Sequence, residues 1–302
     1  MKLLRILIVD AYSLQTRKLY KRNNMKLNSR LYEELLYKIT SYPITITTIF
    51  IDDEIESNIN VNKYEGVIWT GSSYNIYNSN SFIEKQKKIC NECFIKKIPQ
   101  FGSCWGLQLA SEVCGGIVGK NKIGKREFGI SNKITLTEKG KTHPMFRGKN
   151  TTFNALTSHE DELQFIPSNI KVLASNNHSY VQAICATKNN SEFWATQYHP
   201  EFNLGYLSKM IIARKERLLR EKFFKNEEEL LEYSNNLQII NKQPELINNR
   251  GQETAPEQPS LRGQETAPGL ILNNKYGFNE LFSNLMTNNK YCELKNWLDL
   301  LA

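Results

Sequence analysis

A cysteine stands between two glycines where an apolar segment changes into a helical pattern. The segment FGSCWG (101–106) places Cys104 between Gly102 and Gly106. A sharp strand-to-helix turn needs small flanking residues, and it puts its apex residue at a helix N-terminus, where the dipole favours a thiolate. The backbone N–H of Trp105 would point the same way and could form half of an oxyanion hole. Taken alone, this pattern fits a nucleophile and a buried structural cysteine equally well.

A histidine and a glutamate two residues apart end a later predicted strand. The segment QYHPEF (197–202) contains His199, Pro200 and Glu201. Because proline fixes φ and helps the chain leave the strand, a turn there could bring the Glu201 carboxylate to the imidazole. The carboxylate would then set the tautomer and support the imidazolium, as the third member of a nucleophile–base–orienter set does. Alone, His-Pro-Glu is more often a turn than part of a triad.

A glycine followed by two small residues ends a third apolar segment, WTGSSYNIYN (69–78). The loop after Gly71 could offer backbone N–H groups to an anion or an oxyanion. It is also consistent with a simple flexible strand exit. Elsewhere, Cys90 and Cys93 form a C-x-x-C on a predicted helix with no second pair nearby, whereas structural zinc needs four ligands. We therefore expect no metal site there.

The elements that must position these residues alternate between strand and helix patterns. Strands are predicted at 6–10, 44–52, 66–71 and 98–102, and helices at 29–39, 82–97 and 105–115. This alternation predicts an α/β fold with an open, mostly parallel sheet flanked by helices, and functional residues at the carboxyl ends of its strands. Gly71 and Cys104 both fall at such ends. From about residue 131, five short strands read as antiparallel additions, the last of them EFWATQYH (192–199).

The chain after residue 205 changes character. Residues 206–237 predict one long charged helix, interrupted or continuous, within a helical extension at 206–247. The heptapeptide RGQETAP occurs at 250–256 and again at 262–268, in a stretch with almost no apolar residues. We expect a disordered insert at 248–274 and a final amphipathic helix in 275–302 that docks on a main domain formed by 1–205.

Composition indicates a globular protein and excludes several other classes. The 302 residues are 40% hydrophobic and 23% charged, with a net charge of +8. Basic residues are scattered and share segments with acidic ones, so we expect no nucleic-acid partner. The opening MKLLRILIVD is broken by Arg5 and stopped by Asp10, which favours a buried strand over a signal peptide. No apolar stretch is long enough to span a membrane. Six dispersed cysteines favour a reducing, cytoplasmic location.

Together, the motifs resemble those of the class I glutamine amidotransferases. The family's G-x-C-x-G-x-Q elbow is matched by Gly102, Cys104, Gly106 and Gln108, and its H-P-E by residues 199–201. The loop TGSSYNIY is similar to its oxyanion loop. Three further segments are similar to stand-alone proteins related to the glutaminase domain of GMP synthase: GKREFGI (124–130), THPMF (142–146) and ALTSHEDEL (155–163). The resemblance covers roughly residues 4–205. Ser103 stands where the family usually has an apolar residue.

The resemblance implies a flavodoxin-like fold and a glutaminase half-reaction without a cofactor or metal. Cys104 would attack the side-chain amide of glutamine, with His199 as base and acid and Glu201 as its orienter. The oxyanion would be held by backbone N–H groups of Gly71, Ser72 and Trp105. Glutamine would be bound by Gly71, Gln108, Ser158 and His159. For His159, a purely structural role in local hydrogen bonds is equally consistent.

Four functions remain open from the sequence. An amidotransferase of this form would need a synthetase subunit on a separate chain to receive ammonia, whereas a stand-alone γ-glutamyl hydrolase or peptidase would act on a small molecule alone. Both need the same thiol, base and oxyanion hole. A non-catalytic binding protein on the same fold would need none of them, and a redox-sensing cysteine protein would not need the H-P-E segment.

Overall fold

The computed structural model describes residues 2–52, 59–78, 80–242 and 289–302. Within these ranges nine strands form one sheet in the order β2-β1-β3-β4-β11-β10-β9-β6-β7, and β5 and β8 form a separate pair. The strands are β1 (Leu4–Asp10), β2 (Ile44–Phe50), β3 (Gly66–Trp69), β4 (Gln100–Ser103), β5 (Ile117–Lys120), β6 (Glu127–Leu136), β7 (Thr152–His159), β8 (Asp161–Phe165), β9 (Ile170–Ser175), β10 (Ala183–Lys188) and β11 (Ser191–Thr196).

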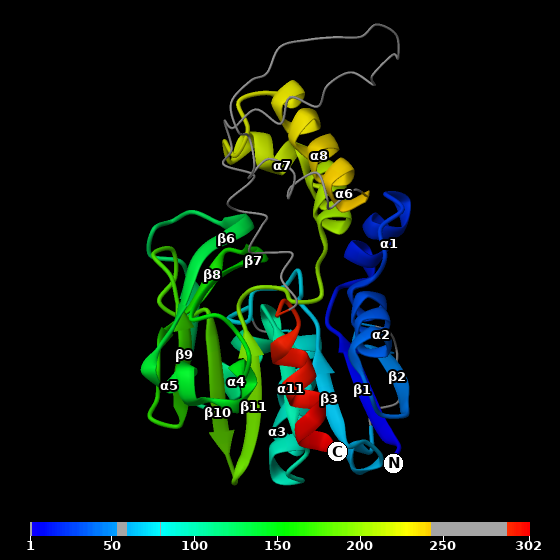
Figure 1. Ribbon diagram of the computed structural model, residues 1–302, viewed down its shortest axis with the longest axis vertical. Coiled ribbons are helices and arrows are strands. Elements are labelled where there is room, and N and C mark those ends of the chain that lie inside the picture. Colours follow the sequence, from blue (N-terminus) through cyan, green and yellow to red (C-terminus); the bar gives the residue numbers. More distant parts are fainter. Residues whose placement is uncertain (1, 53–58, 79, 243–288) are drawn as a thin grey trace, which may run out of the picture.

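Helices cover both faces of the sheet, which confirms the predicted α/β class (Figure 1). They are α1 (Leu14–Arg22), α2 (Asn28–Ile39), α3 (Ser81–Ile95), α4 (Trp105–Val113), α5 (Glu138–Thr142), α6 (Leu204–Ala213), α7 (Lys215–Arg220), α8 (Glu227–Lys242) and α11 (Cys292–Leu301), with 3-10 turns η1 (Val61–Lys63) and η2 (Pro144–Phe146).

Alternating side chains of the central strand divide the core into two layers. Leu7 and Val9 of β1 pack in the layer under α3 and α4, and Ile6 and Ile8 pack in the layer under α2 and α11. This follows from the two-residue period of a strand, which sends successive side chains to opposite faces. Because both faces are buried, β1 reads as a continuous apolar run and not as an alternating one.

The parallel part of the sheet extends one strand further than the sequence suggested. Strands β2, β1, β3 and β4 pair in parallel, as predicted. The segment expected as the last antiparallel addition, β11, is antiparallel to β10 but parallel to β4, with Thr196 opposite Ser103. The prediction missed the parallel pairing because a hairpin between β10 and β11 does not indicate which strand pairs with the other edge of β11. This pairing brings the chain after residue 196 beside the end of β4.

The charged helical segment expected at 206–237, interrupted or continuous, is interrupted twice and forms three helices. It breaks at Arg214, between α6 and α7, and again at residues 221–226, where Lys222 has a positive φ of 59°. The Asn226 side chain then accepts a hydrogen bond from the Glu229 N–H at the start of α8. These helices pack on α1 around their own apolar cluster, beyond the carboxyl ends of the parallel strands (Figure 1). Helical periodicity continues through both breaks, so it does not reveal them.

The last helix, α11, lies against the sheet (Figure 1). Its Trp297 ring lies 6.0 Å from the Phe101 ring of β4. A Cβ on Gly66 would come within 2.6 Å of Trp297, so β3 needs glycine there. The repeat insert expected at 248–274 lies outside the described residues, as do residues 275–288 of the final segment. None of the helices in the described ranges is long and apolar enough to cross a membrane.

Candidate active site

Cys104 occupies a strained turn between β4 and α4. Its φ of 51° and ψ of −95° lie outside the regions that side-chain-bearing residues favour. Its N–H donates to the Thr196 carbonyl at 2.7 Å, which ties the turn to β11. A Cβ on Gly102 would lie 2.8 Å from the Gly106 Cα, and a Cβ on Gly106 would lie 3.2 Å from Trp69. Strand and helix can therefore approach this closely only because both flanking residues are glycines.

His199 lies beside this turn because β11 runs parallel to β4. The Glu201 Oε1 atom lies 2.7 Å from His199 Nδ1. The Phe202 ring stacks on the imidazole, with centroids 3.9 Å apart and planes 3° from parallel. Since Glu201 holds Nδ1, Nε2 is the ring nitrogen left for the Cys104 side chain. The structure thus brings a cysteine, a histidine and a carboxylate from two distant segments of the chain to one place.

The charge of the histidine depends on these neighbours. Burial lowers the pKa of His199, but the negative charge of Glu201 and hydrogen bonds to Cys104 and Glu201 outweigh it and raise the pKa to about 9. These neighbours therefore favour the protonated ring. A protonated imidazole beside a thiol stabilises the thiolate, which is the reactive form of cysteine.

The three residues expected to hold an oxyanion line the same region. Gly71 lies so close to His199 that a Cβ there would be 3.0 Å from its Cε1 atom. The Ser72 hydroxyl donates to the Ala11 carbonyl at 2.7 Å, which fixes the loop to the end of β1. Trp105 is the first residue of α4, where N–H groups have no acceptor inside the helix. The arrangement can stabilise negative charge next to Cys104.

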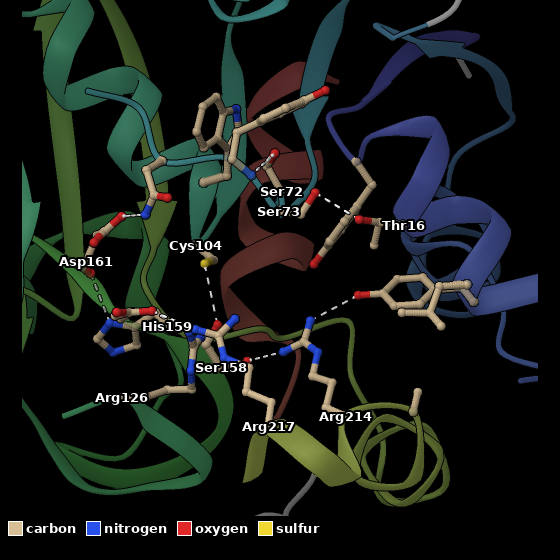
Figure 2. A pocket seen from close by; sticks show the side chains of 18 of the residues that line it. Thr16, Ser72, Ser73, Cys104, Arg126, Ser158, His159, Asp161, Arg214 and Arg217 are labelled. Carbon is tan, nitrogen blue, oxygen red and sulfur yellow. Dashed lines mark hydrogen bonds and ion pairs between the residues drawn. The ribbon is translucent and has the colours of Figure 1, made fainter. Parts of the chain in front are cut away.

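Cys104 lines a cavity of about 540 Å³, and Figure 2 shows side chains that surround it. Its lining includes Gln108, Ser158 and His159, three of the four residues expected to bind glutamine, whereas Gly71, the fourth, is not among the lining residues. The Cys104 Sγ atom lies 3.9 Å from the Ser158 carbonyl oxygen. Residues 212–217 of the α6–α7 region also line the cavity, so the C-terminal helices contribute to the pocket as well as the main sheet.

His159 is held by local partners at both ring nitrogens. Nε2 lies 2.8 Å from Glu127 Oε2, and Nδ1 lies 3.1 Å from the Asp161 carbonyl. Burial raises the pKa of Glu127, but hydrogen bonding to His159 and neighbouring polar groups lowers it to about 2. With both nitrogens engaged, the imidazole can shape the cavity wall but has no free ring nitrogen for a ligand in this arrangement.

Two polar residues at the site were not singled out as site residues from the sequence. The Ser103 hydroxyl donates to Glu201 Oε1 at 3.0 Å, although Ser103 had been noted only as a departure from the family pattern. Arg214 lines the cavity and donates to the Ser158 hydroxyl at 2.7 Å. In the sequence, nothing distinguishes Arg214 from the many basic residues around it. In the structure, it differs from them because it lies at the break between α6 and α7.

One group of side chains within the described residues has the types and spacing of metal ligands. Atoms of His143, Cys185 and Glu192 lie within 4.8 Å of one another, and none of the three lines the Cys104 cavity. Cys90 and Cys93, the C-x-x-C pair, are both buried in α3, and burial raises the pKa of each thiol. These two cysteines pack as apolar residues.

Comparison with known proteins places the chain in a family. The family model for class-I glutamine amidotransferases matches residues 17–217, which is more than half of the chain. The chain belongs to the class I glutamine amidotransferase family. This confirms the resemblance drawn from the motifs, and a glutaminase-type function fits the membership.

Two curated relatives of this chain differ in what their names say they act on. A γ-glutamyl-L-1-hydroxyisopropylamide hydrolase of a Pseudomonas species is 30% identical over 67% of this chain and 69% of its own. One of the subunits of the glutamine-hydrolysing GMP synthase of Sulfolobus acidocaldarius is 28% identical over 56% of this chain and 84% of its own. Membership and relatives together support an amidotransferase or hydrolase enzyme.

Solved structures agree on the fold. A glutamine amidotransferase from Thermotoga maritima superposes with a TM-score of 0.55 at 17% identity, covering 79% of this chain and 93% of its own. One from Methylobacillus flagellatus gives a TM-score of 0.55 at 12% identity, covering 86% of this chain and all of its own. The class I amidotransferase fold is thus shared at very low sequence identity.

Proposed function

We propose that the chain hydrolyses a γ-glutamyl amide, glutamine or a substituted relative, through a thioester on Cys104. The observation that carries this proposal is the 2.7 Å contact between His199 Nδ1 and Glu201 Oε1 beside a strained cysteine turn. A protonated histidine that is held by a carboxylate and lies next to a thiol is what nucleophilic catalysis by cysteine requires.

In the proposed reaction, the Cys104 thiolate attacks the amide carbonyl carbon, and the oxygen takes the negative charge. The N–H groups of Gly71, Ser72 and Trp105 stabilise that oxygen. As the carbon–nitrogen bond breaks, His199 gives its proton to the departing ammonia or amine. Water then attacks the thioester while His199 takes a water proton, and the carbon–sulfur bond breaks to release glutamate and restore the thiolate beside the protonated His199. Glu201 keeps the imidazole oriented throughout and balances its charge.

The size of the cavity and one relative favour an amide hydrolase as a second form of this function. A cavity of about 540 Å³ lies within the range of pockets for drug-sized molecules. The Pseudomonas relative, matched over two thirds of this chain, is named for hydrolysis of a substituted γ-glutamyl amide. An amidotransferase would instead pass ammonia to a separate acceptor chain, and the name of the Sulfolobus relative supports that form.

The domain division proposed from the sequence fits this function. The family match at 17–217 supports a catalytic domain over about 1–205, and it also includes residues 206–217 at the start of the extension at 206–247. The packing of α11 on the sheet supports a final segment, within 275–302, that returns to that domain. The extension and the final segment would then both belong to the catalytic domain, with residues 248–274 as an insert between them.

The proposal is tested by measuring glutamate release from glutamine and from γ-glutamyl methylamide. We expect the parent chain to release glutamate and Cys104→Ser to release none. Cys114→Ser is the matched control, because Cys114 is a buried thiol at the other end of α4. Equal turnover by the parent and Cys104→Ser would overturn the assignment. Release from the methylamide alone identifies the hydrolase form, and release from glutamine that rises when an acceptor chain binds identifies the amidotransferase form.

A further inference from the structure

The Cys104 cavity contains a guanidinium group that no carboxylate neutralises among the described residues. Arg214, between α6 and α7, is partly buried and points into the cavity (Figure 2). Its Nη1 donates to Ser158 Oγ at 2.7 Å, and its Nη2 donates to the Tyr20 hydroxyl at 3.1 Å. Both partners are neutral. A guanidinium has five N–H donors, so Arg214 retains donors for a further acceptor.

Two neighbouring arginines, Arg126 and Arg217, differ from Arg214 because each is paired with carboxylates. Arg126 and Arg217 both contact Glu160 Oε2, at 2.6 and 2.8 Å. Glu221 completes the set, 2.6 Å from Arg217 Nε and 3.4 Å from Arg126 Nε. The two guanidinium groups of Arg126 and Arg217 are therefore balanced by the two carboxylates of Glu160 and Glu221. Arg214 has no carboxylate partner among the described residues. Burial and then the charges of Arg217 and Arg214 lower the pKa of Arg126, against the opposite effect of Glu221 and Glu160, so the guanidinium groups lie close enough to interact.

Ser158 lies between the Arg214 guanidinium and the Cys104 sulfur, and contacts both. Ser158 links the two, since its carbonyl oxygen lies 3.9 Å from Cys104 Sγ and its hydroxyl lies 2.7 Å from Arg214 Nη1. In a γ-glutamyl group, four carbon–carbon bonds separate the amide carbon from the α-carboxylate carbon, about 5 Å when extended. If Cys104 attacks the amide carbon, the α-carboxylate about 5 Å away can therefore reach toward the Arg214 guanidinium on the other side of Ser158.

We propose that Arg214 binds the α-carboxylate of the γ-glutamyl group whose amide Cys104 attacks. This inference rests on the proposed function and names the feature by which the site selects its substrate. The planar guanidinium matches a carboxylate in two parallel hydrogen bonds, and it loses less hydration than an ammonium would. Substrate binding would supply the counter-charge that the protein itself lacks at Arg214. The break after α6 is then functional, because a continuous helix would give this residue a different position.

The test compares two amides that differ by the carboxylate. Glutamine carries it, and 4-aminobutanamide has the same amide and amine without it. In Arg214→Met we expect kcat/KM for glutamine to fall about 10- to 100-fold, the range for a hydrogen bond to a charged group, and kcat/KM for 4-aminobutanamide to stay unchanged. Arg214→Lys should keep part of the preference for glutamine. The control is Lys209→Met, which removes a cation of α6 that does not line the cavity.

Because the comparison is made within each variant, partial misfolding lowers both rates equally and would not imitate the expected result. An equal loss with both amides overturns the inference while leaving the proposed function intact. A loss seen with γ-glutamylglycine but not with γ-glutamyl methylamide would assign Arg214 to a carboxylate on the leaving group and also overturns it. If the parent chain hydrolyses no amide, glutamine is titrated calorimetrically into Cys104→Ser with and without Arg214→Met. Equal affinity, or no binding to either, then contradicts the role of Arg214.

Discussion

The Ser103 hydroxyl donates a hydrogen bond of 3.0 Å to Glu201 Oε1, the same oxygen that lies 2.7 Å from His199 Nδ1. The other oxygen, Oε2, is buried and has no hydrogen-bond partner in the described part of the chain. A single carboxylate oxygen therefore carries both contacts. Since Ser103 directly precedes Cys104, this bond links the position of Glu201 to the cysteine turn itself.

Ser103→Ala should lower kcat without changing KM. One hydrogen bond between a hydroxyl and a carboxylate contributes about 1–2 kcal/mol, so kcat should fall roughly 5- to 30-fold. The control is Ser111→Ala, which removes another buried hydroxyl from α4 that bonds only to a helix carbonyl. Steady-state kinetics on the best γ-glutamyl substrate measures both. A rise in KM at constant kcat would contradict a positioning role for Ser103.

Glu201→Gln should shift the pH dependence of the reaction. In the parent chain, kcat/KM should fall as the pH rises through about 9, where His199 loses the proton that it gives to the leaving group. Without the carboxylate, burial dominates and lowers the pKa of His199, so the fall should move to lower pH. A pH–rate profile of both chains measures the shift, and an unmoved alkaline limb would count against the pairing.

The same pair makes a pH-dependent contribution to stability. The pKa of His199 is raised in the folded chain, to about 9 from an ordinary value near 6.5. The protonated form therefore stabilises the fold fully below about 6.5, and this contribution is lost as the pH rises through about 9. The difference in free energy of unfolding between the parent and Glu201→Gln should shrink over that interval, as measured by denaturant titrations at several pH values.

The sequence predicted the parts of the site that depend on local chemistry. The glycines around Cys104 follow from the close approach of β4 and α4, and proline followed by Glu201 predicted a turn that returns a carboxylate to the histidine. The alternation of strands and helices also predicted which ends of the sheet carry the site. Each of these inferences needs only residues within one or two elements.

What the sequence did not predict depends on contacts between distant elements. The bond from Ser103 to Glu201 spans 98 positions, and it exists because β11 pairs in parallel with β4, which the hairpin pattern did not show. Arg214 gains its role from a helix break that hydrophobic periodicity does not mark. A polar residue such as Ser103 in an apolar strand is noticeable in a sequence. Which side chain it bonds to depends on how the strands are ordered in the sheet.

Replacing Cys104 by glycine should relieve backbone strain. The φ of 51° and ψ of −95° cost a residue with a Cβ about 1–3 kcal/mol, whereas glycine tolerates them. Cys104→Gly should therefore unfold at higher denaturant than Cys104→Ala, even after the entropic cost of glycine, by about 1 kcal/mol. Both variants lack the thiol, so activity does not enter. If Cys104→Ala were the more stable chain, the turn would not be strained.

Gly71→Ala should impair the site through lack of space, since Gly71 has no positive φ. The added Cβ would lie 2.9 Å from the Tyr12 hydroxyl oxygen and 3.0 Å from His199 Cε1. We expect kcat to fall at least about 10-fold, because displacement of a catalytic group by a fraction of an ångström is costly. Adding Tyr12→Phe removes one of the two clashing atoms and should restore part of the rate. No recovery would mean that the His199 contact alone is responsible for the loss.

The central claim is that Cys104 carries a γ-glutamyl thioester during turnover. Acid quenching within milliseconds of mixing with glutamine or γ-glutamyl methylamide, followed by peptide mass spectrometry, tests it most directly. We predict a mass gain of one glutamyl group on the peptide containing Cys104, absent when hydrolysis is complete and absent in Cys104→Ser. Release of glutamate with Cys104 unmodified at every time point, or with the adduct on another residue, would contradict the account.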